Sequence, residues 1–375
     1  MPSKKILFFG LNRPKRAPSQ RYRFEQFFPV LEERGIEYDY RYLLNQKMDE
    51  NLYAPGSYIQ KGLIVFSCFV KLTYAWLFVV RKYEYVFVQK QLFMLGTSFF
   101  ERQFAKKAKL IYDFDDATWM MNISKANRKL AFLKNPNKTN EIIKVAYKVV
   151  VGNDFLANYA RQFNQNVVVI PTVVNTENYK RKARYTEKEN GKICIGWSGS
   201  HTTIEHFKIL IPTLEKLKEK YGEGIYFKVI GDTNFRHEKL AIQGIRWSEE
   251  TEVAELEEID IGIMPLPYDE WSEGKCGLKG LVYMSMSIPN MMSGVGVNKT
   301  IIQHGENGFI CDSEADWLTT FDTLIKDFEL RKSIGEKGRD TILASFSVDS
   351  VFEDFISIFQ VFKTKDSIEI PQDNS

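Results

Sequence analysis

The strongest constraint on the fold is an alternation of strand and helix patterns that runs along the chain and then starts again. Residues 5–10 form a short apolar run that ends in Gly10, and apolar residues then recur at helical spacing up to Gly35. Residues 36–42 alternate between apolar and charged side chains, and buried-strand candidates follow at 85–88, 110–112, 149–151 and 167–170. This rhythm predicts a mainly parallel sheet with helices on both faces.

The composition changes after Asn175. Residues 180–192 are highly charged and lack apolar periodicity, which is typical of a linker. The rhythm then restarts with strands predicted at 193–197, 226–230 and 259–264, a long helix over 204–221 and an amphipathic helix over 348–362. A length of 375 residues also favours two domains.

We therefore predict an α/β protein with two Rossmann-like, doubly wound domains that face a cleft, where ligands bind at the carboxyl ends of the strands. The N-terminal domain spans residues 1–180 and the C-terminal domain spans 181–345. Residues 346–375 form a C-terminal helix and tail that we expect to pack back toward the N-terminal domain.

Composition places the chain among ordinary globular proteins of the cytoplasm. It is 44% hydrophobic and 26% charged, and its first residues do not resemble a secretory signal peptide. The cysteines are scattered and lack metal-ligand spacing, which favours a reducing compartment; they are Cys68, Cys194, Cys276 and Cys311. Residues 62–80 are apolar except for Lys71 and a few small polar residues. We expect a helix that is buried or lies in the membrane interface, rather than a span, because Lys71 stands in its middle.

Charge is unevenly distributed although the net charge is only +3. Five basic residues and no acid lie between Arg13 and Arg23, and seven basic residues and one acid lie between Lys125 and Lys148. These runs are either solvated faces or a surface for an anionic partner, such as a lipid headgroup or pyrophosphate. They accompany no nucleic-acid motif, so we expect no nucleic acid as a partner.

Two glycine-bearing turns in the second half suit a phosphate. The turn Gly196-Trp-Ser-Gly-Ser200 stands between a strand and a helix, where glycines either serve sterically or let backbone N–H groups approach an anion. In residues 271–280, Lys275 and Lys279 flank the start of an apolar helix, with Gly277 between them. A helix N-terminus with two lysines suits a diphosphate, whereas the alternative is an ordinary surface lysine pair.

The sequence resembles glycosyltransferase family 4, whose members have the GT-B fold and retain the anomeric configuration of the transferred sugar. The resemblance rests on residues 283–289 (YMSMSIP), 305–309 (GENGF), 113–117 (DFDDA) and 169–175 (VIPTVVN). It implies nucleotide-sugar binding by the second domain and acceptor binding by the first. The two glutamates that many members carry are replaced by Gly274 and Val282, and Glu273 stands one residue from the first of these positions.

The predicted function is transfer of a hexosyl group from a nucleotide-diphosphate sugar to a surface-polysaccharide or lipid-linked glycan. Predicted catalytic residues are Asp115, Asp116, Lys275 and Lys279, and predicted acceptor-binding residues are Arg21 and Arg23. Predicted donor-binding residues are Gly196, Ser198, Gly199, Ser200, Gly231, Asp232, Glu273, Cys276, Gly277 and Leu278. We expect neither metal nor cofactor, since the lysines supply the charge, and we expect a cytoplasmic protein that is peripheral to an anionic inner membrane face. The alternatives are a non-catalytic GT-B scaffold subunit and a sugar-nucleotide epimerase.

Overall fold

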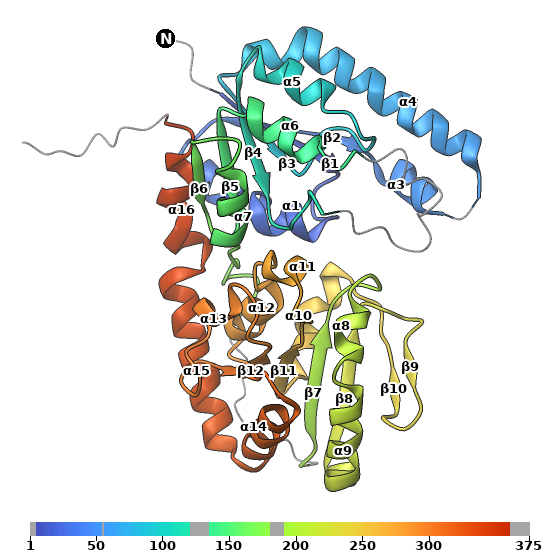
Figure 1. The fold of residues 1–375 in the computed structure, drawn as a ribbon, viewed down its shortest axis with the longest axis vertical. Helices are drawn as coiled ribbons and strands as arrows, with labels where there is room; N and C mark the ends of the chain where they lie inside the picture. Colours follow the sequence, from blue (N-terminus) through green and yellow to red (C-terminus); the bar gives the residue numbers. More distant parts are fainter. Residues whose placement is uncertain (1–4, 55, 121–134, 181–190, 361–375) are drawn as a thin grey trace, which may run out of the picture.

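Two parallel sheets, one above the other in Figure 1, organise the molecule. The computed structural model describes residues 5–54, 56–120, 135–180 and 191–360. The first sheet has the strand order β2-β1-β3-β4-β5-β6 and the second has the order β13-β12-β11-β7-β8. Every pairing within these two sheets is parallel, which confirms the predicted α/β architecture of two doubly wound halves. In each sheet the order reverses beside the first strand, which is where such sheets bind ligands.

The first half is built around four largely buried strands, β1, β3, β4 and β5, whereas the edge strands β2 and β6 are partly exposed. Its strands are β1 (Ile6–Asn12), β2 (Tyr38–Leu44), β3 (Tyr85–Gln89), β4 (Lys109–Phe114), β5 (Lys148–Val151) and β6 (Val167–Val169). Its helices are α1 (Pro18–Arg23), α2 (Phe28–Glu33), α3 (Gln46–Tyr53), α4 (Tyr58–Tyr74), α5 (Phe99–Ala105), α6 (Lys138–Val145) and α7 (Asp154–Ala160). Helix α4 continues as a π-helical turn over Ala75–Val79 and a 3-10 turn over Val80–Lys82, so residues 62–80 are helical as predicted.

The second half repeats the plan. Its strands are β7 (Ile193–Ser198), β8 (Ile225–Ile230), β11 (Ile261–Met264), β12 (Asn290–Met292) and β13 (Phe309–Ile310), with a small hairpin of β9 (Arg236–His237) and β10 (Ile242–Gln243). Its helices are α8 (Ile204–Lys208), α9 (Ile211–Tyr221), α10 (Glu249–Glu257), α11 (Glu270–Glu273), α12 (Leu278–Ser285), α13 (Asn298–Ile301), α14 (Glu314–Lys326) and α15 (Phe328–Ser345).

The single helix predicted over residues 204–221 is wrong. The structure has two helices, α8 and α9, with a break at Ile209 and Leu210. Pro212 lies in the first turn of α9, where its missing N–H costs nothing and its fixed φ suits a new helix start. Most of the predicted linker, residues 181–190, lies outside the described residues.

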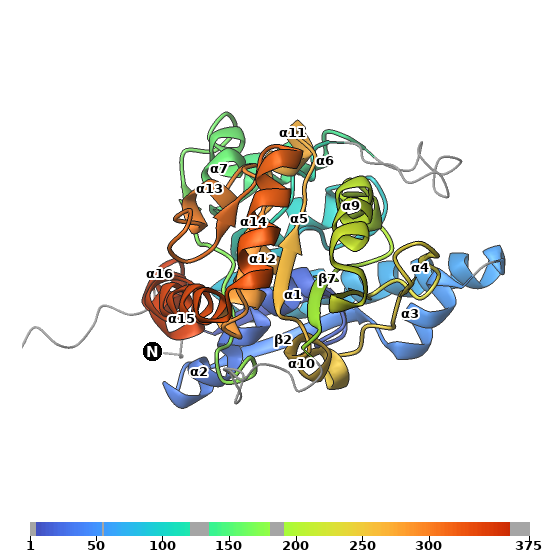
Figure 2. The same cartoon turned by 90° about the horizontal axis from the view of Figure 1, so that it is seen from below.

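The chain ends by returning to the first half. Helix α16 (Val348–Ser357) follows α15, and together they form a column along one side of both halves in Figure 1, seen end-on in Figure 2. Phe355 of α16 is buried and stacks on Phe27 with ring centroids 3.9 Å apart. Burial of such aromatic pairs ties α16 to the core of the first half. Residues 361–375, which include the end of the predicted tail helix, lie outside the described residues.

Candidate active site

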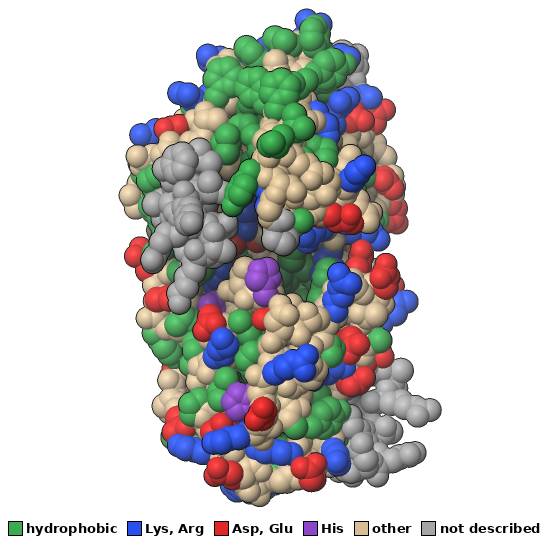
Figure 3. All heavy atoms as spheres, turned by 90° about the vertical axis from the view of Figure 1, so that its right-hand side faces the viewer, with side chains coloured by type: hydrophobic (Ala, Val, Ile, Leu, Met, Phe, Trp, Pro, Cys, Tyr) green, Lys and Arg blue, Asp and Glu red, His purple; other side chains and the backbone are tan. Residues whose placement is uncertain are grey.

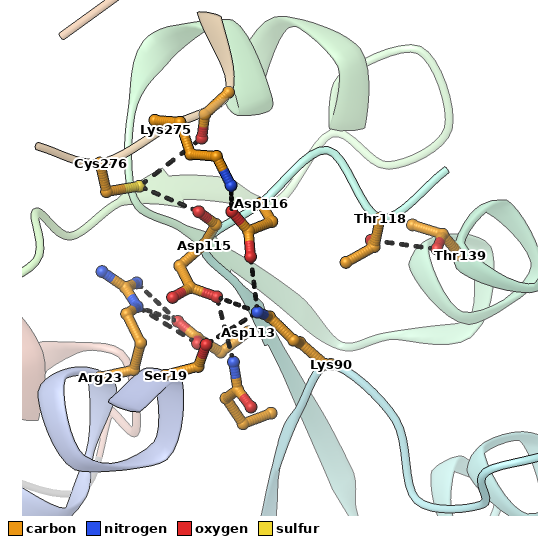
Figure 4. A network of polar contacts seen from close by, with 12 residues as sticks. Ser19, Arg23, Lys90, Asp113, Asp115, Asp116, Thr118, Thr139, Lys275 and Cys276 are labelled. Carbon is orange, nitrogen blue, oxygen red and sulfur yellow. Dashed lines mark hydrogen bonds and ion pairs between the residues drawn. The ribbon is translucent and has the colours of Figure 1, made fainter. Parts of the chain in front are cut away.

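An acidic corner stands where β3 and β4 end. Asp113 is buried and pairs with Arg23, whose guanidinium Nη2 lies 2.6 Å from the Asp113 carboxylate. Two residues later, Asp115 lies 2.9 Å from the ammonium group of Lys90, and Asp116 lies 2.8 Å from the same group (Figure 4). Lys90 directly follows β3, so the parallel pairing of β3 and β4 brings these residues together.

Charge within this corner is balanced between the two strands. Although burial opposes it, the nearby Asp115 and Asp116 carboxylates raise the pKa of Lys90 above its usual value. Burial alone would raise the pKa of Asp116, but Lys90 and Lys275 hold it well below its usual range. Lys90 therefore stays cationic and Asp116 stays anionic at neutral pH.

The second half reaches the same corner through the segment between α11 and α12. The Lys275 ammonium donates to Asp116 over 2.8 Å, and the Cys276 thiol donates to the Asp115 carbonyl oxygen over 3.3 Å. Asn153, at the start of α7, donates its side-chain amide to the carbonyl oxygens of Gly274 and Lys275. Charged and neutral hydrogen bonds thus join the two halves where their strands end (Figure 4).

Close packing accompanies these bonds. A Cβ added at Gly152 would lie 2.2 Å from the Cys276 sulfur, and one added at Gly274 would lie 3.1 Å from the Ala117 Cβ. Burial raises the pKa of the Cys276 thiol to about 12, so the thiol remains protonated and fills space between the halves. The donor contact predicted for Cys276 stays a prediction.

Helix α12 presents an unneutralised positive end to the space beside this corner. Gly277, with φ of +70°, precedes the helix, and a Cβ there would collide with Ile301. The backbone N–H groups of the next three residues, from Leu278 to Gly280, donate to no acceptor among the described residues. Unpaired amides at a helix start, with the helix dipole, favour an anion.

Lys279 adds a cation to this end of the helix. Its ammonium lies 5.4 Å from the centroid of the Trp197 ring, and within the described part of the chain it forms no hydrogen bond or ion pair. Burial, together with the nearby charge of Lys275, lowers the pKa of Lys279 to about 8. Burial and the same two lysines lower the pKa of His206 to about 4, so that imidazole is neutral.

The turn at residues 196–200, for which we predicted phosphate binding, forms hydrogen bonds within the protein. Its amide groups are already satisfied: Ser198 N–H donates to the Tyr283 hydroxyl, Gly199 N–H to the Ile230 carbonyl oxygen, and Ser200 N–H to the Thr203 hydroxyl. The hydrogen bonds made by these three residues leave no free backbone donor for an anion in this conformation.

The glycines of this turn are required sterically. A Cβ at Gly196 would lie 2.3 Å from Ile259, and one at Gly199 would lie 2.4 Å from the Trp197 ring. Gly231 has φ of +113°, and a Cβ there would lie 1.6 Å from the carbonyl oxygen of Gly199. Gly199 and Gly231 therefore let the ends of β7 and β8 approach each other, and Gly196 leaves room for Ile259.

The remaining predicted donor residues lie near the same strand ends. The Asp232 carboxylate accepts from the backbone N–H of Asn234 and so stabilises its own turn. Glu273 ends α11, and its side chain forms no hydrogen bond or ion pair with any described residue. Leu278 begins α12 and is half-buried. Val282, which stands where many family members carry a glutamate, is buried in the core of the second half.

Arg21 and Arg23, for which we predicted acceptor binding, both form ion pairs within the protein, and their predicted role stays a prediction. Arg23 is buried in its pair with Asp113 and also donates to the Ile170 carbonyl oxygen. Arg21 lies 3.0 Å from Glu252 of α10, so it links the two halves. Both guanidinium groups therefore serve contacts within the protein.

Three residues of the site were missed from the sequence: Lys90, Asn153 and Trp197. Lys90 follows the carboxyl end of a buried strand, and ligands bind at such ends in doubly wound sheets, so its position in the sequence was a usable signal. Asn153 is an N-cap residue, and Trp197 stands within the glycine turn. Among the described residues, no group of three or more His, Cys, Asp or Glu side chains has an arrangement that could hold a metal ion.

Comparison with known proteins bears on the family and the fold. Residues 192–327 match the family model described as glycosyl transferases group 1, whereas no curated protein matches the chain. Sucrose-phosphate synthase from Thermosynechococcus elongatus has a TM-score of 0.71 and 12% identity, with coverage of 95% of this chain and 98% of that one. A glycosyltransferase from Rickettsia africae has a TM-score of 0.65 and 16% identity, with coverage of 97% and 100%.

A third solved structure extends the likeness. HepE from Anabaena, in complex with UDP and glucose, has a TM-score of 0.61 and 15% identity, with coverage of 96% of this chain and 100% of that one. At such identities the likeness establishes the fold. The chain therefore has the GT-B fold, and its residues 192–327 carry a domain of the glycosyl transferases group 1 type.

Proposed function

We propose that this protein is a retaining glycosyltransferase of family 4 type that moves a hexosyl group from a nucleotide-diphosphate sugar to a surface-polysaccharide or lipid-linked glycan. The observation that carries the proposal is the positive start of α12, where Lys279 and three backbone amides lack partners among the described residues. A diphosphate supplies the matching charge and acceptors. The family match over residues 192–327 supports the same assignment.

In the proposed reaction, breaking the bond between sugar and diphosphate leaves negative charge on the diphosphate. Lys275 and Lys279 stabilise that charge together with the N-terminus of α12. Asp116 of the first half lies 2.8 Å from the ammonium group of Lys275 in the second half. The first half therefore positions a cation that the donor needs. Asp115 and Asp116 lie next to this point and orient the acceptor hydroxyl.

We propose that no metal or other cofactor takes part. The Asp113-x-Asp115 pair resembles a divalent-metal motif, but Arg23 pairs with Asp113, and Lys90 pairs with Asp115. The carboxylates thus already face cations, while the leaving diphosphate faces lysines. Retention of configuration rests on the resemblance of residues 283–289 and 305–309 to family 4.

The second candidate is a non-catalytic subunit that binds a nucleotide sugar without transferring it. The buried Val282 favours it, because many relatives carry a glutamate there for the nucleotide ribose. Glu273 keeps a carboxylate near the first family position and favours the transferase.

Thermal-shift measurements with UDP, GDP and ADP and their sugar conjugates, with and without EDTA, test the proposal. HepE has been solved with UDP and with UDP-glucose, so uridine nucleotides come first. A ligand at 100 times its dissociation constant stabilises the native state by about 2.7 kcal/mol. Stabilisation by one nucleotide in EDTA, followed by sugar transfer to a glycan-lipid extract with retention of configuration, is expected. Binding without transfer supports the second candidate, and no binding contradicts both.

A further inference from the structure

Helix α4 and its continuation to Lys82 carry a continuous stripe of exposed apolar side chains. The helix projects from the first half on the side away from α16 (Figures 1 and 2). Ile59 is 84% exposed, and Leu63 and Phe66 are each 64% exposed. The stripe recurs at helical spacing; its members are Ile59, Leu63, Phe66, Val70, Tyr74 and Leu77. Large exposed apolar patches mark interaction sites.

The opposite face of the same helix is committed to the protein core. Ile64, Cys68, Leu72, Ala75 and Val79 are buried in the core of the first half. Lys71 donates its ammonium to the Leu43 carbonyl oxygen over 2.7 Å. Residues 58–82 are long and apolar enough to cross a membrane, but a crossing would strip this buried face from the core. The fold therefore favours a helix that lies along an apolar surface.

A basic rim borders the stripe near its C-terminal end. Residues 51–83 contain no Asp or Glu, and Arg81 and Lys82 end the helix in exposed positions. Lys106 is also exposed, and the neighbouring Lys107 donates to the Trp76 carbonyl oxygen. Arg81, Lys82 and Lys106 form no ion pair with any described residue. Apolar and aromatic side chains bordered by unneutralised cations match a surface with an apolar interior and anionic headgroups.

We propose that the α4 stripe docks on an anionic lipid bilayer, with the helix in the plane of the membrane interface. The apolar side chains enter the headgroup boundary, and Arg81, Lys82 and Lys106 contact the lipid phosphates. The aromatic residues Tyr58 and Tyr74 are 80% and 56% exposed and suit the same boundary, where amphipathic rings gather.

One face of the molecule carries both exposed hydrophobic side chains and an opening between the two halves. Figure 3 shows exposed hydrophobic side chains over the upper half and, on the same face, a hollow between the two halves. If the proposed transfer reaction is correct, a lipid-linked acceptor in the same bilayer would approach the site from this face. That last step rests on the proposed function, whereas docking itself does not.

Flotation of the full-length protein with vesicles tests the docking directly. We expect binding to phosphatidylcholine vesicles that contain about one-third phosphatidylglycerol, and weaker binding to phosphatidylcholine alone. The variant L63D/F66D should bind about ten-fold less or weaker still, because two inserted apolar groups are replaced by carboxylates. Neutralisation in R81Q/K82Q should weaken binding by about five-fold per charge, with less effect in high salt.

The matched control is L343D, which changes an exposed leucine of α15 in the second half and should float like the unchanged protein. Melting temperatures of all variants check that the fold is intact. The proposal is overturned if the unchanged protein stays off anionic vesicles, or if L63D/F66D binds as well as L343D. Conversion of a dimer to a monomer by L63D/F66D, without vesicle binding by the parent, would assign the stripe to self-association instead. Because no assay here needs sugar transfer, failure of docking and failure of the proposed function are distinguishable.

Discussion

Lys279 gives the sharpest test of the diphosphate site, because its charge should depend on the ligand. In the free protein, burial and the nearby charge of Lys275 lower its pKa to about 8, from an ordinary value of 10.5. A bound diphosphate favours the charged form, so binding should raise this pKa and take up a proton. Asp116 opposes the shift, and His206, with a pKa of about 4, does not titrate in this range.

The size of the effect follows from these values. With a pKa of about 8, Lys279 is about nine-tenths charged at pH 7 and about one-tenth charged at pH 9. If the bound form stays charged, affinity for a nucleoside diphosphate should fall nearly ten-fold between these pH values. The nucleotide itself keeps the same charge, because the last ionisation of a terminal phosphate lies near pH 6.

Calorimetric titration with UDP, GDP or ADP at pH 7, 8 and 9 measures this dependence, and buffers of different ionisation enthalpy measure the proton uptake. K279A should weaken binding by about ten- to hundred-fold, the loss expected for a charge-assisted hydrogen bond, and should abolish the pH dependence. K326A, at an exposed lysine of α14, is the control. Equal affinity at pH 7 and pH 9, or equal binding by K279A and the control, would refute the assignment of Lys279.

Three further changes test the account of the fold. K279M should raise the melting temperature of the free protein by about 2–4 °C at pH 7, because the native state below pH 8 holds a charge it disfavours. This gain in melting temperature should vanish as the pH approaches 10.5. Calorimetric scans at a series of pH values measure both the gain and its loss. F355A should destabilise by about 3–5 kcal/mol in urea unfolding, since it removes the ring stacked on Phe27; a loss below 1 kcal/mol would contradict the docking of α16. G231A should fail to fold or melt far below the parent, because its Cβ meets the Gly199 carbonyl, whereas G224A, with open space around it, should differ little.

The sequence was informative where a structural feature depends on neighbouring residues. Lys275, Gly277 and Lys279 stand within five positions, and the start of an apolar helix can be recognised from that segment. The alternation of strands and helices likewise predicted both sheets, because buried parallel strands are continuous apolar runs.

The sequence could not show where a distant residue already forms a hydrogen bond or ion pair with a predicted site residue. The backbone amide of Ser198 donates to the hydroxyl of Tyr283, which is 85 positions away, so this amide of the glycine turn is already hydrogen-bonded. Arg23 pairs with Asp113, 90 positions away, and Arg21 pairs with Glu252, 231 positions away. A basic run shows which charges exist but cannot show which ones folding neutralises.

The lysines of the candidate site also differ in how far neighbouring carboxylates already neutralise their charge. Lys90 faces two carboxylates, and Lys275 faces Asp116, so folding already offsets their charge. Lys279 forms no hydrogen bond or ion pair with any described residue, and its ammonium lies over the Trp197 ring. Burial and the nearby charge of Lys275 lower its pKa, although Asp116 opposes that shift. An incoming diphosphate therefore gains most at Lys279, while Lys275 must share its charge with the first half. If the proposed donor site is correct, separating the two halves would break the contact between Lys275 and Asp116 and would change the charge that Lys275 offers to the donor.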